Sequence, residues 1–239
     1  MKKLIGYKNS NAFNRRNLVK FPPSYPNEMM VKILSSNAYS KILTKSFFKK
    51  KLRVLEIGCF SGNNLRFFIE KNYNVAGVEI NKEMINLGVK NLKRLKYKVP
   101  KIVLGHNTNL PFADNSFDLL VSINTLHYCS QDEVLKALIE FKRVLKKRQS
   151  GGRDSSAGGI AYIETSGSKH FSRKMSKKLA PLRWRWKSND FKDGYEFGFF
   201  SNKKHFELYL KKIFSEVEVF ERTEFAHVDL HFYQGLCAV

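Results

Sequence analysis

The stretch VLEIGCFSGNNL, from Val54 to Leu65, joins a short apolar run to a carboxylate and a loop with two glycines. Its spacing is that of a strand turning into a helix, and backbone N–H groups at a helix start favour an anion. A dinucleotide pyrophosphate normally requires three glycines in such a turn, but no glycine stands at position 60 or 63. The turn therefore favours a ligand that presents one small carboxylate.

A second carboxylate, Glu79, ends the next apolar run, NVAGVEI, and lies 17 residues after Gly62. In a parallel sheet both strand ends would meet at the same edge, where ligands bind. A carboxylate at that place can accept hydrogen bonds from both hydroxyls of a ribose. An acid at a strand end can also simply cap the following helix, and this alternative stays open.

The elements that would position these groups alternate along the chain. Apolar runs predict strands, and apolar residues at helical spacing predict helices, with a capping box formed by Ser130 and Glu133. The predicted strands cover 53–57, 74–80, 101–105, 117–123, 160–165, 216–222 and 230–239, and the predicted helices cover 63–71, 82–95, 130–147 and 202–212, with one or two more within 27–48. This order predicts a doubly wound α/β fold with a mostly parallel sheet and an antiparallel hairpin at the end.

Composition limits the class of protein. The length of 239 residues suits one α/β domain with additions, and no apolar run approaches the length of a membrane span. The three cysteines are far apart and include no CxxC pair, so neither a disulfide framework nor a metal site is predicted. We expect a reduced, cytoplasmic setting without a bound metal.

The formal net charge of +22 is concentrated in two regions. Residues 1–53 hold 13 Lys and Arg against one acid, and residues 169–187 hold 8 against none. Such an excess can be a set of solvated lysine-rich faces, or it can be a surface that meets an anionic partner. Both interpretations remain open at this point.

Four segments in this order resemble one known family. The segments are VLEIGCFSGNNL, GVEI, GHNTNLPFADNSFDLLVSINTLHY and EFKRVLKK, the last followed by a glycine pair. Together they resemble the class I S-adenosylmethionine-dependent methyltransferases, and most closely the type 11-like group with the signature LPF-x-D-x-SFD. The resemblance covers about residues 50–165 well and the closing strands moderately. It implies a Rossmann-like seven-stranded sheet with helices on both faces, and S-adenosylmethionine as the cofactor.

The resemblance also implies which residues hold the cofactor. The loop residues Glu56, Gly58, Cys59, Phe60 and Gly62 would line its methionine part, Glu79 would hold the ribose, Ile80, His106 and Asn107 would lie by the adenine, and Asn124 would lie near the transferred methyl. The family usually has glycine where Phe60 stands, so we expect the backbone there to avoid a conformation that only glycine tolerates. It usually has aspartate where His106 stands, and His106 or Asn107 would replace that hydrogen bond.

Chemistry at the methyl group requires alignment of a nucleophile and, for a hydroxyl, a general base. His127 and Tyr128 follow the fourth predicted strand, where the acceptor would arrive, and are the predicted catalytic residues. His127 could equally be a packed histidine near the cofactor.

The two basic regions are predicted to cover the mouth of the site. We expect residues 1–50 to form an N-terminal extension and helical cap, and residues 51–239 to form the methyltransferase domain with a basic aromatic insert at about 167–200. Cations alternate with aromatic residues in the insert, as in a surface that holds phosphates and stacks bases or sugars, and Lys177, Lys178, Trp184 and Trp186 are the predicted substrate contacts.

The predicted function is methyl transfer to an O or N atom of an anionic small-molecule or glycan-type substrate. The alternative is an RNA methyltransferase, which the charge favours although no RNA-binding module is recognisable. A further alternative is a non-catalytic binding protein that retains the fold.

Overall fold

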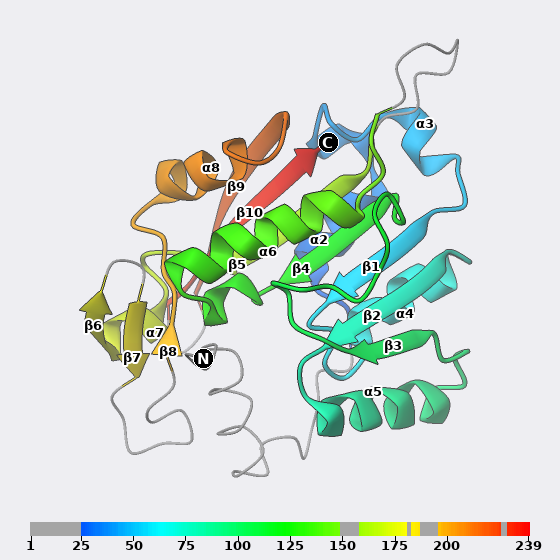
Figure 1. Ribbon diagram of the computed structural model, residues 1–239, viewed down its shortest axis with the longest axis horizontal. Helices are drawn as coiled ribbons and strands as arrows, with labels where there is room; N and C mark the ends of the chain where they lie inside the picture. The colour runs from blue at the N-terminus through cyan, green and yellow to red at the C-terminus, as the bar shows by residue number, and fades with distance from the viewer. Residues whose placement is uncertain (1–24, 149–157, 181–182, 187–195, 226–228) are drawn as a thin grey trace.

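A computed structural model describes residues 25–148, 158–180, 183–186, 196–225 and 229–239 of the chain. Its centre is a seven-stranded sheet with the strand order β3-β2-β1-β4-β5-β10-β9 (Figure 1). The strands are β1 (Arg53–Ile57), β2 (Asn74–Glu79), β3 (Lys101–Leu104), β4 (Leu119–Ile123), β5 (Ile160–Ser166), β9 (Glu216–Phe225) and β10 (Asp229–Ala238). Strands β1 to β5 run parallel to one another, while β10 pairs antiparallel with both β5 and β9. The predicted Rossmann-like sheet with its closing hairpin is therefore confirmed.

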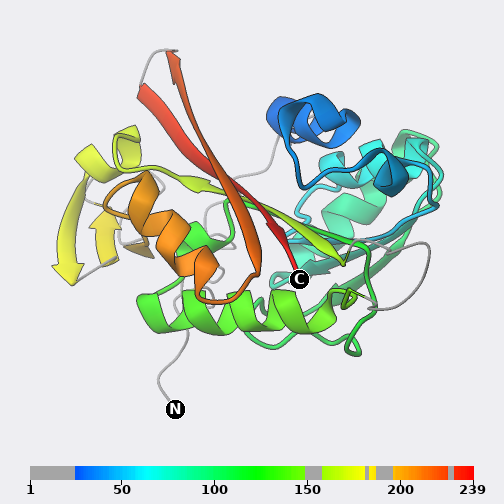
Figure 2. The same cartoon turned by 90° about the horizontal axis from the view of Figure 1, so that it is seen from above.

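Helices cover both faces of this sheet (Figure 2). One face carries α2 (Glu28–Ser35), α3 (Lys45–Phe48), α4 (Asn63–Glu70) and α5 (Lys82–Arg94), and the other carries α6 (Gln131–Val144) and α8 (Lys203–Lys211). Short 3-10 turns η1 (Asn37–Tyr39) and η2 (Leu126–Tyr128) complete the connections. The capping box predicted at Ser130 and Glu133 forms at the start of α6. None of the helices in the described segments has the length and apolar character that a bilayer crossing requires.

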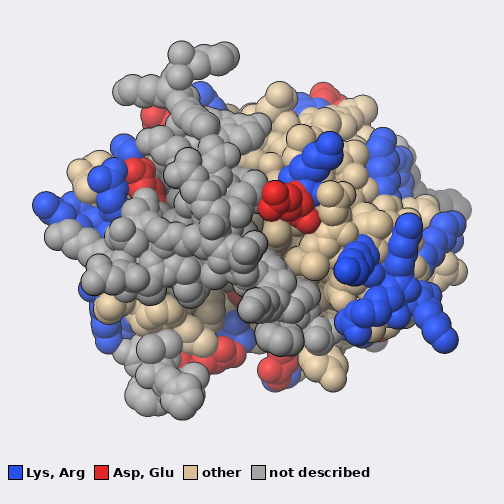
Figure 3. Space-filling model, turned by 90° about the horizontal axis from the view of Figure 1, so that it is seen from below, with Lys and Arg blue, Asp and Glu red and all other residues tan. Residues whose placement is uncertain are grey.

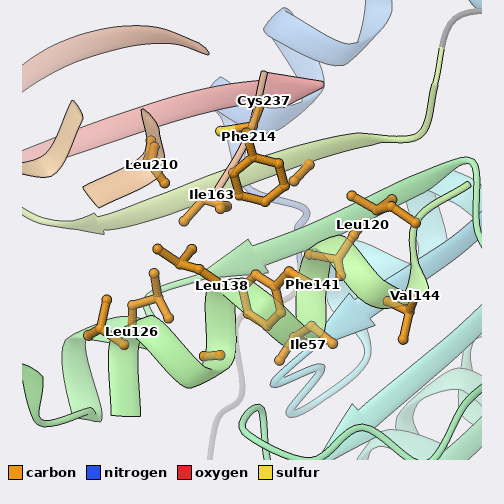
Figure 4. Close-up of a cluster of buried hydrophobic side chains, with 14 of the residues drawn as sticks. Ile57, Leu120, Leu126, Leu138, Phe141, Val144, Ile163, Leu210, Phe214 and Cys237 are labelled. Atoms are coloured by element: carbon orange, nitrogen blue, oxygen red, sulfur yellow. The ribbon is translucent and has the colours of Figure 1, made fainter. Parts of the chain in front are cut away.

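Alternation along the buried strands divides the core between the two faces. Ile57, Leu120 and Ile163 point to the α6 and α8 side, where they meet Phe141 and Phe214 in one apolar cluster (Figure 4). The alternate residues of the same strands face the other side of the sheet, where they pack against α2 and α4. A parallel strand buried on both faces leaves polar side chains only at its end, so the polar residues gather at the carboxyl edge of the sheet.

Asn27 attaches the N-terminal helix α2 to that edge. Its side-chain oxygen caps the helix by accepting a hydrogen bond from the Met30 N–H at 2.8 Å, while its Nδ2 donates to Glu164 at 3.1 Å. The Asn27 N–H donates to the Asn64 side chain at 2.8 Å. Residues 1–24 of the predicted extension lie outside the described residues. The division at residue 50 stays a prediction.

The segment between β5 and α8 contains four short elements that the sequence did not predict. They are α7 (Phe171–Lys174), β6 (Ser176–Ala180), β7 (Arg183–Trp186) and β8 (Glu196–Phe197), and the three strands form a small antiparallel sheet beside the main one (Figure 1). It rests on η2, because the Gly198 N–H donates to the His127 carbonyl oxygen at 2.6 Å.

Candidate active site

A cavity of about 340 Å³ opens at the carboxyl edge of the sheet, between the ends of β1, β2 and β4. Its walls come from loops that follow these strands. The lining residues are Ile57, Gly58, Phe60, Val78, Glu79, Ile80, Asn81, Met84, Gly105, His106, Asn107, Ile123, Asn124, Thr125, Tyr128 and Cys129. The volume lies in the range of small-molecule sites. Seven of the ten predicted cofactor residues lie in this wall, whereas Glu56, Cys59 and Gly62 do not.

The turn after β1 takes a left-handed backbone at alternate residues. Gly58 has a φ of 69°, Phe60 a φ of 44° and Gly62 a φ of 76°. The expectation that Phe60 would avoid the left-handed region is therefore wrong. The Phe60 N–H donates a hydrogen bond to Glu79, which holds the residue in this costly conformation. A side chain at Gly58 would meet Thr125 Cγ2 at 2.5 Å, so glycine is needed there to let the turn approach β4.

Glu79 is buried at the end of β2 and accepts three backbone hydrogen bonds. Its Oε1 accepts from the N–H groups of Ile80 at 2.8 Å and Asn81 at 3.1 Å, and its Oε2 accepts from Phe60 at 3.0 Å. Burial raises the pKa of this carboxyl group, while the three N–H groups act in the opposite direction. A carboxylate offers about four acceptor positions, so about one remains for a ligand hydroxyl.

Asn107 is a residue of the cavity wall with a buried amide oxygen. Its Nδ2 donates to Cys129 Sγ at 3.1 Å, and the Cys129 thiol lies 3.6 Å from the Thr125 carbonyl oxygen to which it can donate. Since the thiol hydrogen is directed at Thr125, Sγ is the acceptor toward Asn107, and the amide orientation is fixed. The Asn107 Oδ1 is then left without a hydrogen-bond partner among the described residues, although the residue is only 8% exposed.

His106 is held differently from its neighbour. Its Nδ1 accepts from the Thr108 N–H at 3.2 Å and lies 2.7 Å from the Thr108 hydroxyl. Because Nδ1 acts as an acceptor, the neutral ring carries its proton on Nε2. Burial lowers the pKa of this histidine. His106 therefore cannot reproduce the acceptor character of an aspartate, whereas Asn107 can.

Asn124 follows β4 with a φ of 55°, another non-glycine residue in the left-handed region. Its N–H donates to the Glu164 carbonyl oxygen at 2.8 Å, which fixes the backbone. The Asn124 Oδ1 is buried and, within the described part of the chain, has no hydrogen-bond partner. Two residues of the same cavity wall, Asn107 and Asn124, thus each carry a buried amide oxygen without a hydrogen-bond partner among the described residues.

Glu56 lies behind the wall rather than in it. Its Oε1 accepts from Asn64 Nδ2 at 2.8 Å, and complete burial raises its pKa to about 8. Among the other predicted residues outside the wall, Gly62 begins α4 and Cys59 packs against Leu65 and Leu92. Glu56, Cys59 and Gly62 therefore belong to the turn and its support without lining the cavity.

A protein-family profile described as a methyltransferase domain matches residues 55–150. A crystal structure of a SAM-dependent methyltransferase from Methanosarcina mazei aligns over 82% of this chain and 97% of its own, with a TM-score of 0.63 and 18% identity. Residues 55–150 are therefore similar to a methyltransferase domain, and the likeness to the solved structure extends to the fold of most of the chain. Both findings agree with the family that the sequence resembles.

Two further comparisons place the methyltransferase domain among known proteins. An uncharacterized protein from Methanocaldococcus jannaschii is 35% identical over 134 residues, and the match spans 53% of each chain, about half the length of that relative. The structure of a Burkholderia thailandensis 1,6-didemethyltoxoflavin-N1-methyltransferase, with its substrate and S-adenosylhomocysteine bound, aligns over 100% of this chain and 91% of its own, with a TM-score of 0.59 and 13% identity. At this identity the likeness concerns the fold alone.

The two predicted catalytic residues of the methyltransferase domain occupy different places. Tyr128 lies in the cavity wall, and burial raises its pKa to about 12. His127 is 5% exposed and lies outside the wall, in an aromatic cluster where its ring centroid is 4.5 Å from Phe197 and 5.0 Å from Phe199. The two rings touch edge to face at 5.1 Å, so His127 supports Tyr128 from behind.

The predicted substrate contacts of the methyltransferase domain lie on the small sheet. Lys177 and Lys178 are exposed on β6, and Trp184 on β7 is half-buried with the Arg173 guanidinium 4.8 Å from its ring. The side chain of Trp186 lies outside the described part of the structure. The arginines of β7, Arg183 and Arg185, both form ion pairs with the buried Glu196.

Several wall residues of the methyltransferase domain were not predicted. Thr125 packs against Gly58, Met84 projects from α5, and Cys129 positions Asn107. In the sequence, the only sign that Thr125 and Cys129 belong to the site is that each stands next to a predicted site residue. The sequence gives no such sign for Met84, because a methionine at helical spacing indicates a core residue. Among the described residues, His, Cys, Asp and Glu side chains form no group that could hold a metal ion.

Proposed function

We propose that the chain is an S-adenosylmethionine-dependent methyltransferase that acts on an O or N atom of an anionic acceptor. The observation that carries this proposal is the pair of buried amide oxygens, Asn107 Oδ1 and Asn124 Oδ1, which belong to residues of a cavity wall that also contains Glu79. A buried acceptor without a donor is costly, so the two oxygens favour a ligand with N–H groups at both places. An adenosine linked to an amino acid has an exocyclic amine at one end and an ammonium group at the other.

The residues in the wall fit this cofactor. Glu79 would accept a ribose hydroxyl at its remaining position, Asn107 would accept from the adenine amine, and Asn124 would lie by the methionine part, with Ile80 against the adenine. The glycine at position 58 lets the turn pass close to β4, which keeps the methionine end of the cavity open. S-adenosylmethionine supplies an activated methyl group that needs no further activation by the protein.

The chain has to orient the acceptor and exclude water. With its pKa near 12, Tyr128 keeps its proton at neutral pH, so we assign it the role of a hydrogen-bond donor that positions the acceptor. His127 would hold the Tyr128 ring through their edge-to-face contact. A hydroxyl acceptor would still need a base, whereas an amine acceptor with its lone pair free would not.

The acceptor class rests on the exposed cations of the small sheet. Lys177 and Lys178 are exposed, and neither forms an ion pair among the described residues. Their sheet joins the cavity wall through the Trp184, Phe199 and His127 rings. These contacts favour an anionic small-molecule or glycan-type acceptor. RNA is the second candidate acceptor, because a separate cationic surface lies along α5.

Calorimetric titration with S-adenosylhomocysteine tests the proposal directly. We expect saturable heat with one ligand per chain. The Asn107→Leu, Asn124→Leu double variant removes both amide oxygens and should lose this heat while keeping its thermal unfolding transition. No heat at millimolar ligand would instead favour a binding protein that retains the fold without the cofactor.

A further inference from the structure

A cationic surface follows α5 and the start of β3. Residues 82–101 hold seven Lys and Arg against one acid, Glu83. All seven are exposed, and we name them the α5 stripe: Lys82, Lys90, Lys93, Arg94, Lys96, Lys98 and Lys101. Figure 3 shows Lys and Arg gathered at the side of the molecule where α5 lies.

Acids of the described residues do not neutralise the stripe. Within the described part of the chain, none of its seven cations takes part in an ion pair. The sequence analysis did not single out this excess of cations, because residues 54–127 taken together also contain several acids. Two of those acids, Glu56 and Glu79, are buried and contribute nothing to the surface. Mutual repulsion among unpaired cations favours an external anion.

The stripe leads to the cavity. Lys82 stands between Asn81 and Met84, which both line the cavity. From there α5 extends over 13 residues, or about 20 Å, away from the carboxyl edge of the sheet. The length exceeds what one small anion can cover, so the ligand that fits is an extended chain of charges.

We propose that the α5 stripe binds the phosphate backbone of a nucleic acid. Cations clustered along one helix and the segment that follows it, in a chain with a pI of about 9.9, are the electrostatic footprint of such proteins. A membrane surface fits less well, because no large apolar side chain is exposed between residues 82 and 101, and interfacial helices need an apolar face. A bound strand would pass the rim of the cavity at Lys82.

This inference has two parts, and only one of them rests on the proposed function. Docking of a nucleic acid on the stripe is independent of catalysis, whereas methylation of that nucleic acid rests on the proposed function. The two parts can therefore fail separately.

Charge reversal on the stripe tests the docking. The stripe variant is Lys90→Glu, Lys93→Glu, Lys98→Glu, and the matched control is Lys136→Glu, Lys203→Glu, Lys204→Glu, which reverses three exposed lysines on α6 and α8. Both lower the net charge equally, so they separate location from total charge. Fluorescence anisotropy with labelled tRNA and with duplex DNA, between about 50 and 200 mM salt, measures the affinity and its salt dependence.

We expect the stripe variant to bind at least about tenfold more weakly than the control, with a logarithmic salt slope reduced by about two to three. Preference for tRNA or for DNA identifies the nucleic acid. Equal weakening in both variants overturns the proposal, as does binding of the parent protein to phosphatidylglycerol vesicles and to neither nucleic acid. Calorimetry with S-adenosylhomocysteine should give the same affinity for all three proteins, and a parent that binds nucleic acid but not this ligand removes the proposed function alone.

Discussion

The Phe60 N–H donates to Glu79 Oε2 across 3.0 Å, and this bond joins the turn after β1 to the end of β2. Gly88 lets α5 pack close to the same turn, since a side chain at this position would meet the Phe60 carbonyl oxygen at 2.8 Å. The phenylalanine is thus accommodated in a left-handed conformation by its neighbours. The acid that would hold a ribose also shapes the loop that would hold the methionine part.

Replacing Glu79 by alanine should weaken S-adenosylhomocysteine binding by more than about tenfold, which corresponds to 1.4 kcal/mol. The variant loses the acceptor for the ribose and the bond that fixes Phe60. Calorimetric titration measures the change, and Glu83→Ala, an exposed acid one turn along, is the control. Unchanged affinity in a folded Glu79→Ala protein would refute the ribose assignment.

Asn107 should make the site selective for adenine over hypoxanthine. Its Oδ1 can accept from an amine, whereas the carbonyl oxygen of hypoxanthine would face it as a second acceptor. We expect S-adenosylhomocysteine to bind at least about tenfold more tightly than S-inosylhomocysteine, because an unpaired buried acceptor costs 1–3 kcal/mol. Competition titration of both ligands checks this ratio. Asn107→Leu should bring the ratio close to one and Asn107→Asp should preserve it, and a leucine variant that still discriminates would place the selectivity elsewhere.

The sequence was sufficient to predict the sheet, because the central strands β1, β4 and β5 carry mostly apolar runs, β9 alternates apolar with charged residues, and α5 and α6 begin with clear caps. It missed β6, β7 and β8, since β6 carries two lysines, Arg and Trp alternate in β7, and none of the three has the apolar continuity of a buried strand. These strands are short and depend on tertiary contacts, such as the ion pairs of Glu196 with Arg183 and Arg185, for their pairing.

For the site, the strand ends predicted the turn that contains Gly58 and the acid Glu79, whereas Asn124 was predicted only through the family resemblance. The choice between His106 and Asn107 could not be made from the sequence, because it depends on hydrogen bonds with Thr108 and Cys129. The conformation of Phe60 was predicted wrongly for a similar reason. A backbone bond to Glu79 is a contact between distant residues that no local pattern reveals.

Charge reversal of Lys177 and Lys178 should raise the KM for an anionic acceptor by about two- to tenfold, since each exposed contact contributes up to about 1 kcal/mol. The affinity for S-adenosylhomocysteine should stay unchanged, because neither lysine lines the cavity. Steady-state kinetics with an acceptor that supports turnover give KM, and calorimetry gives the ligand affinity. Lys203→Glu, Lys204→Glu on α8 is the control pair. Equal KM values for the parent and the β6 variant would argue against a basic acceptor contact there.

Glu56 should make the protein less stable as the pH rises from 4.5 to about 8. Burial raises the folded pKa to about 8 from 4.5, so in this window the folded state keeps a proton that the unfolded state has lost. The free energy of unfolding then falls by at most about 1.4 kcal/mol per pH unit from this group. Glu56→Gln keeps an acceptor for Asn64 and removes the titration. Urea unfolding at several pH values should therefore show the variant gaining stability relative to the parent across this window and levelling off above it, and parallel curves would mean that Glu56 ionises normally in the fold.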